Sequence, residues 1–75
     1  MGEGMMAERN WEIMEHIDVF RDDGNWKGEV NMVSWYGSEP KVDVRSWNGE
    51  HSRCSKGITM TIEDARLLGE ILARL

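Results

Sequence analysis

Hydrophobic and polar residues alternate in the middle of the chain, and this pattern predicts β-strands. Between Pro40 and Trp47, Val42 and Val44 fall on one side of an extended chain, whereas lysine, aspartate, arginine and tryptophan fall on the other. Successive strand residues point to opposite faces of a sheet. This segment is therefore predicted to be a strand with a buried aliphatic face. Trp47 is expected on the outer, solvent-accessible face, because the valines already define the inner one.

Three further segments have the character of strands. Residues 11–20 combine β-branched and aromatic residues with imperfect alternation, so a strand is favoured there and a helix is the alternative. A strand over residues 26–35 follows an Asp-Gly turn signal, and residues 57–61 form a short fourth strand. Residues 1–10 contain two glycines and no hydrophobic period, which predicts a flexible N-terminus.

The last segment is predicted to be a helix that runs from Ile62 towards Leu75. Thr61 is suited to be its N-cap, with Asp64 in a capping-box-like position three residues later. Four consecutive strands followed by one helix indicate the α+β class, with an antiparallel meander, in a single domain over residues 11–75.

The apolar stripe of this helix is broader than one sheet contact needs, which points to a partner surface. Gly69 lies in the middle of the helix, where glycine costs about 1 kcal/mol relative to alanine. Close approach of another backbone would explain it, and so would simple tolerance near a chain end. A chain of 75 residues also buries a small core, which favours oligomerisation.

The cysteine content and the absence of a targeting segment predict the cellular compartment of the protein. Cys54 is the single cysteine, so no intrachain disulfide forms, which suits a reducing cytoplasm. The first residues lack the basic and apolar regions of a signal peptide, and no apolar run approaches the length of a membrane span. The chain is therefore expected to be cytoplasmic and not to bind membranes.

The distribution of charge matters more than the net charge of −5, which by itself argues against a generic nucleic-acid binder. Residues 1–25 hold seven acids and two bases, whereas residues 26–61 hold four acids and five bases. Residues 26–61 also contain three of the four tryptophans. Any anion-binding surface is therefore expected in this segment.

No motif in the chain supports an enzyme, a metal site or a cofactor. Zinc needs about four nitrogen or sulfur ligands, and only His16, His51 and Cys54 are available. His51 and Cys54 have no third group to orient a nucleophilic pair, and no glycine-rich loop is present to hold a phosphate.

What remains is a surface of aromatic and basic residues. Single-stranded nucleic acid binds to flat side chains on which bases stack, with cations nearby for the phosphates. The alternative is that the tryptophans cover a small core while lysine and arginine keep the surface hydrated. Tryptophan and arginine are also frequent anchors of protein interfaces, so a protein-interaction module is a second hypothesis.

An ordered set of motifs resembles the positive-cofactor-four family of single-stranded-DNA-binding transcriptional coactivators, in its small bacterial branch. In that family a strand ending in D-[IV]-R-x-[WY] leads through a polar loop to K-G-I-[ST]-L-[TN] and a helix. This chain has DVRSW at 43–47 and KGITMT at 56–61, and VSW at 33–35 is also similar to the bacterial branch. The resemblance covers residues 11–75.

The resemblance implies a four-stranded curved antiparallel sheet followed by one helix, in a homodimer joined largely through the helices. It places Trp47 at the aromatic position of the third strand, Trp35 or Tyr36 at that of the second, and Lys56 at the basic position before Gly-Ile. The family's eukaryotic members are more basic around this surface, which implies modest affinity here. The implied role is transcription regulation or DNA maintenance, and base stacking would tolerate single-stranded RNA as well as DNA.

Pattern and resemblance together give two sets of candidate residues. Lys41, Arg45 and Arg53 are supporting cations, although Arg45 has an alternative partner in Asp43. The predicted nucleic-acid-binding residues are Lys27, Asn31, Trp35, Tyr36, Lys41, Arg45, Trp47, Arg53 and Lys56. The predicted dimer interface consists of Leu68, Gly69, Ile71, Leu72 and Leu75.

Overall fold

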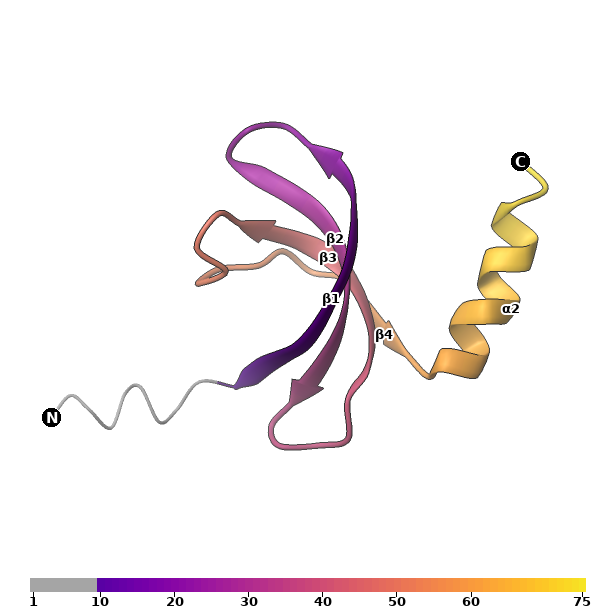
Figure 1. Cartoon of the computed structure of the whole chain (residues 1–75), viewed down its shortest axis with the longest axis horizontal. Helices are drawn as coiled ribbons and strands as arrows, with labels where there is room; N and C mark the ends of the chain where they lie inside the picture. The colour runs from indigo at the N-terminus through magenta and orange to yellow at the C-terminus, as the bar shows by residue number, and fades with distance from the viewer. Residues whose placement is uncertain (1–9) are drawn as a thin grey trace, which may run out of the picture.

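The computed structural model describes residues 10–75, which form one antiparallel sheet and one helix. In chain order the elements are β1 (Trp11–Asp22), β2 (Trp26–Trp35), β3 (Lys41–Asn48), β4 (Ile58–Met60) and α2 (Ile62–Leu72). Neighbouring strands pair in the order β1-β2-β3-β4, and the sheet is strongly curved (Figure 1). The predicted α+β meander with a C-terminal helix is confirmed, and the first segment is a strand rather than a helix. Apart from Asn10, the predicted flexible N-terminus lies outside the described residues.

Local signals account for the turns and for the start of the helix. In the β1–β2 turn, Asp23 Oδ1 accepts a hydrogen bond from the backbone N–H of Trp26 at 2.9 Å. In the β2–β3 turn, Tyr36 and Gly37 both have positive φ, at 53° and 76°, as in a type I′ hairpin turn. Thr61 Oγ1 accepts from the N–H of Asp64 at 3.1 Å, which confirms the predicted N-cap.

One face of the sheet is enclosed by its curvature. Asn31 pairs with Asp43 across β2 and β3, and Lys27 pairs with Trp47, so these residues share a face. Trp47 on this inner face is 0% exposed. The prediction that Trp47 is solvent-accessible is therefore wrong, because the curved sheet brings Trp11 of β1 to within 5.6 Å of its ring.

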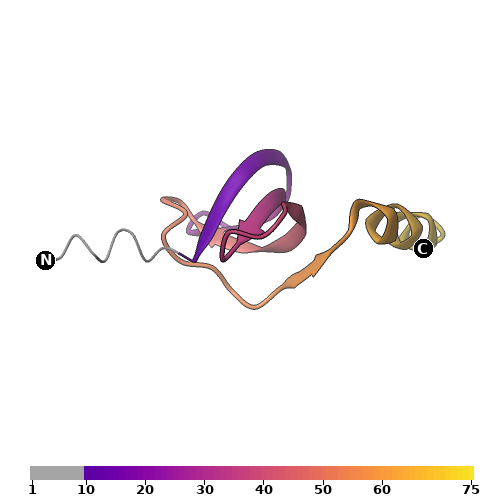
Figure 2. The same cartoon turned by 90° about the horizontal axis from the view of Figure 1, so that it is seen from below.

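The outer face carries the aliphatic residues, among which Val42 is buried and Val44 is half-buried. Helix α2 stands away from the sheet (Figures 1 and 2) and has no buried residue. Leu67, Ile71 and Leu72 of α2 are each about half exposed. The outer face and the helix thus leave apolar surface uncovered in a single chain. Within residues 10–75, no helix is both long enough and apolar enough to cross a membrane.

The junction between the β3–β4 loop and β4 depends on a glycine. A Cβ atom at Gly57 would clash with the carbonyl oxygen of Val44 and the Cβ of Arg45, whereas a Cβ at Gly49 would meet open space. The loop can therefore run this close to β3 only because residue 57 has no side chain.

Replacing Gly57 with alanine should destabilise the fold by about 1–3 kcal/mol, because backbone and packed atoms must shift. The matched change Gly49→Ala should leave stability unchanged or raise it by about 0.4–1 kcal/mol, since alanine restricts the unfolded chain. Urea unfolding of both variants measures the difference. Equal stability of the two would contradict the close approach of Gly57 to β3.

Candidate functional site

A buried carboxylate connects three strands near the centre of the sheet. Asp43 of β3 is 0% exposed, and its Oδ1 accepts from Arg45 Nε at 2.6 Å. Its Oδ2 accepts from Trp35 Nε1 of β2 at 3.0 Å and from Thr59 Oγ1 of β4 at 2.8 Å. Arg45 thus pairs with Asp43, which is one of the two roles that the sequence left open for it.

The same contacts position Trp35 and Arg45, two members of an aromatic and basic surface beside the β2–β3 turn. The Arg45 guanidinium lies 4.6 Å from the centre of the Trp35 ring, in a cation–π contact. Tyr36 is 78% exposed, and its backbone N–H donates to the Asn10 carbonyl at 2.7 Å. Lys41 at the start of β3 is exposed. We call Trp35, Tyr36, Lys41 and Arg45 the turn surface.

Two other predicted cations are solvent-accessible, and a third is partly so. Arg53 and Lys56 are exposed in the β3–β4 loop, and Gly57, which follows Lys56 directly, lies against Arg45. Lys27 is half-buried, with its Nζ 4.0 Å from Asp22 Oδ2. These cations therefore remain candidates for contact with an anion.

Two predicted binding residues do not reach solvent. Trp47 and Asn31 are both 0% exposed, because the inner face that they share is enclosed by the curved sheet. Asn31 is held by hydrogen bonds to His16 and Glu29. The indole N–H of Trp47 is buried without a hydrogen-bond partner among the described residues. Neither residue is placed to stack or bind a strand at the surface.

Four rings form a row across the inner face. The ring centres of Trp35 and Trp11 are 6.3 Å apart, those of Trp11 and Trp47 are 5.6 Å apart, and those of Trp47 and His51 are 5.6 Å apart. Trp11 was not among the predicted site residues. The signal that could have found it is the hairpin register, which pairs Trp11 with Trp35.

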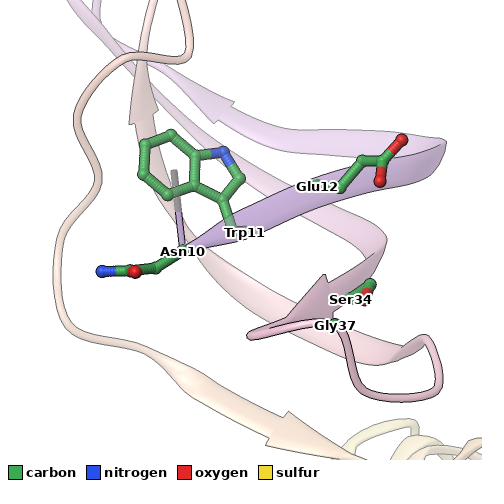
Figure 3. A pocket seen from close by; sticks show the side chains of 5 residues that line it. All are labelled: Asn10, Trp11, Glu12, Ser34 and Gly37. Carbon is green, nitrogen blue, oxygen red and sulfur yellow. The ribbon is translucent and has the colours of Figure 1, made fainter. Parts of the chain in front are cut away.

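A hollow of about 290 Å³ lies where the row meets the β2–β3 turn. Figure 3 shows Asn10, Trp11 and Glu12 around the start of β1 on one side, and Ser34 of β2 and Gly37 of the β2–β3 turn on the other. Because Gly37 follows Tyr36 directly, this hollow adjoins the turn surface.

A second buried carboxylate lies further along β2, surrounded by polar side chains that come from separate segments of the chain. Glu29 is 2% exposed and accepts hydrogen bonds from Asn31 Nδ2 at 2.9 Å and from His51 Nε2 at 2.9 and 3.0 Å. His16 Nδ1 lies 3.7 Å from it. We call His16, Glu29, Asn31 and His51 the polar cluster.

The surroundings of Glu29 keep it ionised. Burial by itself raises the pKa of Glu29, but the hydrogen bonds from Asn31 and His51 and the charges of His51 and His16 outweigh it. The pKa is therefore held below its ordinary value of 4.5. An ionised carboxylate only accepts hydrogen bonds, so His51 must donate from Nε2. Within residues 10–75, no group of three or more histidine, cysteine or acidic side chains is arranged to hold a metal ion.

The pKa of Glu29 predicts how stability depends on pH. Because the pKa of Glu29 is lowered in the folded state, the ionised carboxylate stabilises the fold at pH values above its ordinary pKa of 4.5. This stabilisation is lost as the pH falls through the pKa of the folded state. Glu29→Gln should therefore lose less stability than wild type between about pH 5 and about pH 2. Urea midpoints across this range provide the measurement. The exposed control Glu39→Gln should follow the wild-type profile, and a Glu29→Gln profile as steep as wild type would contradict the assignment.

The chain is similar in sequence to a protein of Treponema pallidum (strain Nichols). The two are 30% identical over 64 residues, which span 84% of this chain and 75% of that protein. That protein is itself described as uncharacterized, so the similarity brings no activity with it. No protein-family model matches the chain. At this identity and coverage, the chain belongs to the same family as the Treponema pallidum protein.

Proposed function

We propose that this protein binds single-stranded DNA, without catalysing a reaction, as a homodimer of the positive-cofactor-four type. The observation that carries the proposal is Tyr36, an aromatic ring 78% exposed at a left-handed turn position. It lies next to Trp35 in the chain, and Lys41 begins the following strand. An exposed ring face with cations nearby is the combination on which an unpaired base can stack.

The chemistry of the turn surface suits unpaired bases. A base has a flat face that stacks on an aromatic ring, and nearby cations meet the phosphates. Duplex DNA hides its base faces, so a stacking surface discriminates against it. With Trp47 buried, stacking is assigned to Tyr36 and to the half-buried Trp35. Trp47 instead supports the Trp11 ring from within.

The buried carboxylates make the surface of the central segment more positive than its composition suggests. Of the four acids in residues 26–61, Glu29 and Asp43 are almost completely buried and hydrogen-bonded. Arg45 is paired with Asp43. The other charged side chains of the segment are four bases, Lys27, Lys41, Arg53 and Lys56, and two acids, Glu39 and Glu50. This local excess supports contact with phosphates in an acidic chain.

Uncovered apolar surface on α2 supports the homodimer. Ile71 and Leu72 are about half exposed, and Leu75 is fully exposed. Gly69 has open space where a Cβ would be, so another backbone could approach the helix there. The proposal includes a cytoplasmic location and a role in transcription regulation or DNA maintenance.

A second function, binding of a protein partner, is favoured by one feature of β1. The register of its pairing with β2 shifts three times, and at each shift one β1 residue has no pairing partner in β2. These residues are Met14, Ile17 and Phe20. All three are exposed, at 53%, 48% and 63%. A row of exposed apolar side chains suits a protein interface. Salt separates the two functions, because phosphate contacts weaken steeply with salt and an apolar interface does not.

Tyr36→Ala should weaken the binding of oligo-dT by about 1–3 kcal/mol, which is the value of one stacked base. Tyr36→Phe should retain most of the affinity, because the ring face is kept. Fluorescence anisotropy at two salt concentrations measures both.

Phe20→Ala is the matched control, since Phe20 is also an exposed aromatic but lies on β1, away from the turn surface. It should bind oligo-dT like wild type. If Tyr36→Ala also binds like wild type, or if duplex DNA competes as well as single strands do, stacking on the turn surface is wrong.

Leu72→Asp should convert the homodimer to a monomer, because a charge would enter the apolar contact between helices. Leu72 is half exposed in the single chain, so the folded protomer should survive. Glu70→Ala, on the same helix, should remain dimeric. Light scattering gives the mass, and circular dichroism checks folding. A wild-type mass of one chain at micromolar concentration would refute the dimer.

A further inference from the structure

A cavity of about 480 Å³ opens on the inner face beside the polar cluster. Its volume falls in the range of small-molecule sites, which is about 300–1,000 Å³. Ile13 and Val19 of β1 give it apolar walls, and Glu29 and His51 give it polar ones. Glutamates as buried as Glu29 are rare in proteins unless they are paired, and the side chains that pair with Glu29 line this same cavity.

The Glu29 carboxylate gives the cavity hydrogen-bond acceptor capacity. Among the described residues, Asn31 and His51 donate to the Glu29 carboxylate, and His16 lies 3.7 Å from it. A carboxylate offers about four acceptor positions, so Glu29 retains capacity for a further donor. The ligand that matches this cavity has a planar ring and adjacent N–H donors.

A base on a bound strand could reach this cavity. Glu29, Asn31 and Trp35 are separated by even numbers of residues along β2, so their side chains point to the same face of the sheet. The cavity and the turn surface therefore lie on one face. Glu29 lies roughly 20 Å from Trp35 along β2 at the rise of an extended strand. The row of rings from Trp35 to His51 runs between the two places, with Trp47 buried within it. Lys27, which also lines the cavity, can meet a phosphate.

We propose that the cavity receives the pairing edge of one guanine in the bound strand, an inference that rests on the proposed binding of single-stranded DNA. Among the four DNA bases, guanine alone presents two adjacent donors, N1–H and the 2-amino group, on its pairing edge. The Glu29 carboxylate accepts from them, and Ile13 and Val19 contact the faces of the ring. His51 moves with its loop to admit the base. Its φ of 56° is unusual for a residue other than glycine, and such strain clusters at sites that change conformation.

The test compares oligo-dT with the same oligonucleotide carrying one central dG, dA, dC or deoxyinosine. The dG strand should bind wild type about 5- to 150-fold more tightly than the dA or dC strand, which is the usual discrimination by a bidentate base contact. Deoxyinosine lacks the 2-amino group and should fall between. Glu29→Gln should lose the preference for dG while its affinity for oligo-dT is unchanged.

Val19→Phe is a second variant, because the larger side chain fills the cavity and leaves Glu29 unchanged. It tests the proposal even if Glu29→Gln does not fold. It should also lose the preference for dG and keep its affinity for oligo-dT. Equal binding of all strands by wild type would overturn the guanine site and leave the proposed function intact. If no strand binds, the proposed function is wrong, and a titration with deoxyguanosine monophosphate decides the cavity. NMR shifts at the His51 ring and the Trp47 indole N–H would then support it, and their absence would refute it.

Discussion

The three hydrogen bonds to the Asp43 carboxylate are the interaction on which the rest of this small structure depends. A charge buried this deeply costs several kcal/mol unless it is fully paired, and here the donors come from β2, β3 and β4. Strand β4 has only three residues, so the hydrogen bond from Thr59 contributes substantially to holding it. Helix α2 begins two residues after β4. One carboxylate therefore orients the Trp35 ring for the turn surface and also fixes the point from which the helix leaves the sheet.

The two buried acids divide the inner face between structure and binding. Asp43 has donors on both of its oxygens, from its own strand at Oδ1 and from both neighbouring strands at Oδ2, and it lines neither described cavity. Glu29 is held by a loop histidine and a neighbouring amide, and it borders open volume. The first arrangement resists change, because any movement leaves a charge unpaired. The second can exchange one donor for another, which is what a binding site requires.

Local sequence signals predicted the elements well and the burial of their side chains less well. The Asp-Gly turn, the Thr61 cap and the alternation in β3 are properties of neighbouring residues, so they can be identified without tertiary structure. Alternation also groups Trp47 with Asp43 correctly, but it does not say towards which face a sheet curves, and that decided the burial of Trp47 and Asn31. The polar cluster could not be predicted for a different reason. His16, Glu29 and His51 come from three separate segments, and only the register of β1 and the path of the β3–β4 loop bring them together.

The register shifts of β1 also bear on how this protein avoids self-assembly into fibrils. Among the described strands, β1 lies at an edge of the sheet, and it is the longest strand, with twelve residues. A long, regular, apolar edge would be a template on which further strands could add without limit. In β1 the regular repeat is interrupted at every third residue from Met14 to Phe20, so an incoming strand cannot stay in register with it for more than three residues. The exposed apolar row can therefore be offered to a specific partner without the edge becoming a seed for aggregation.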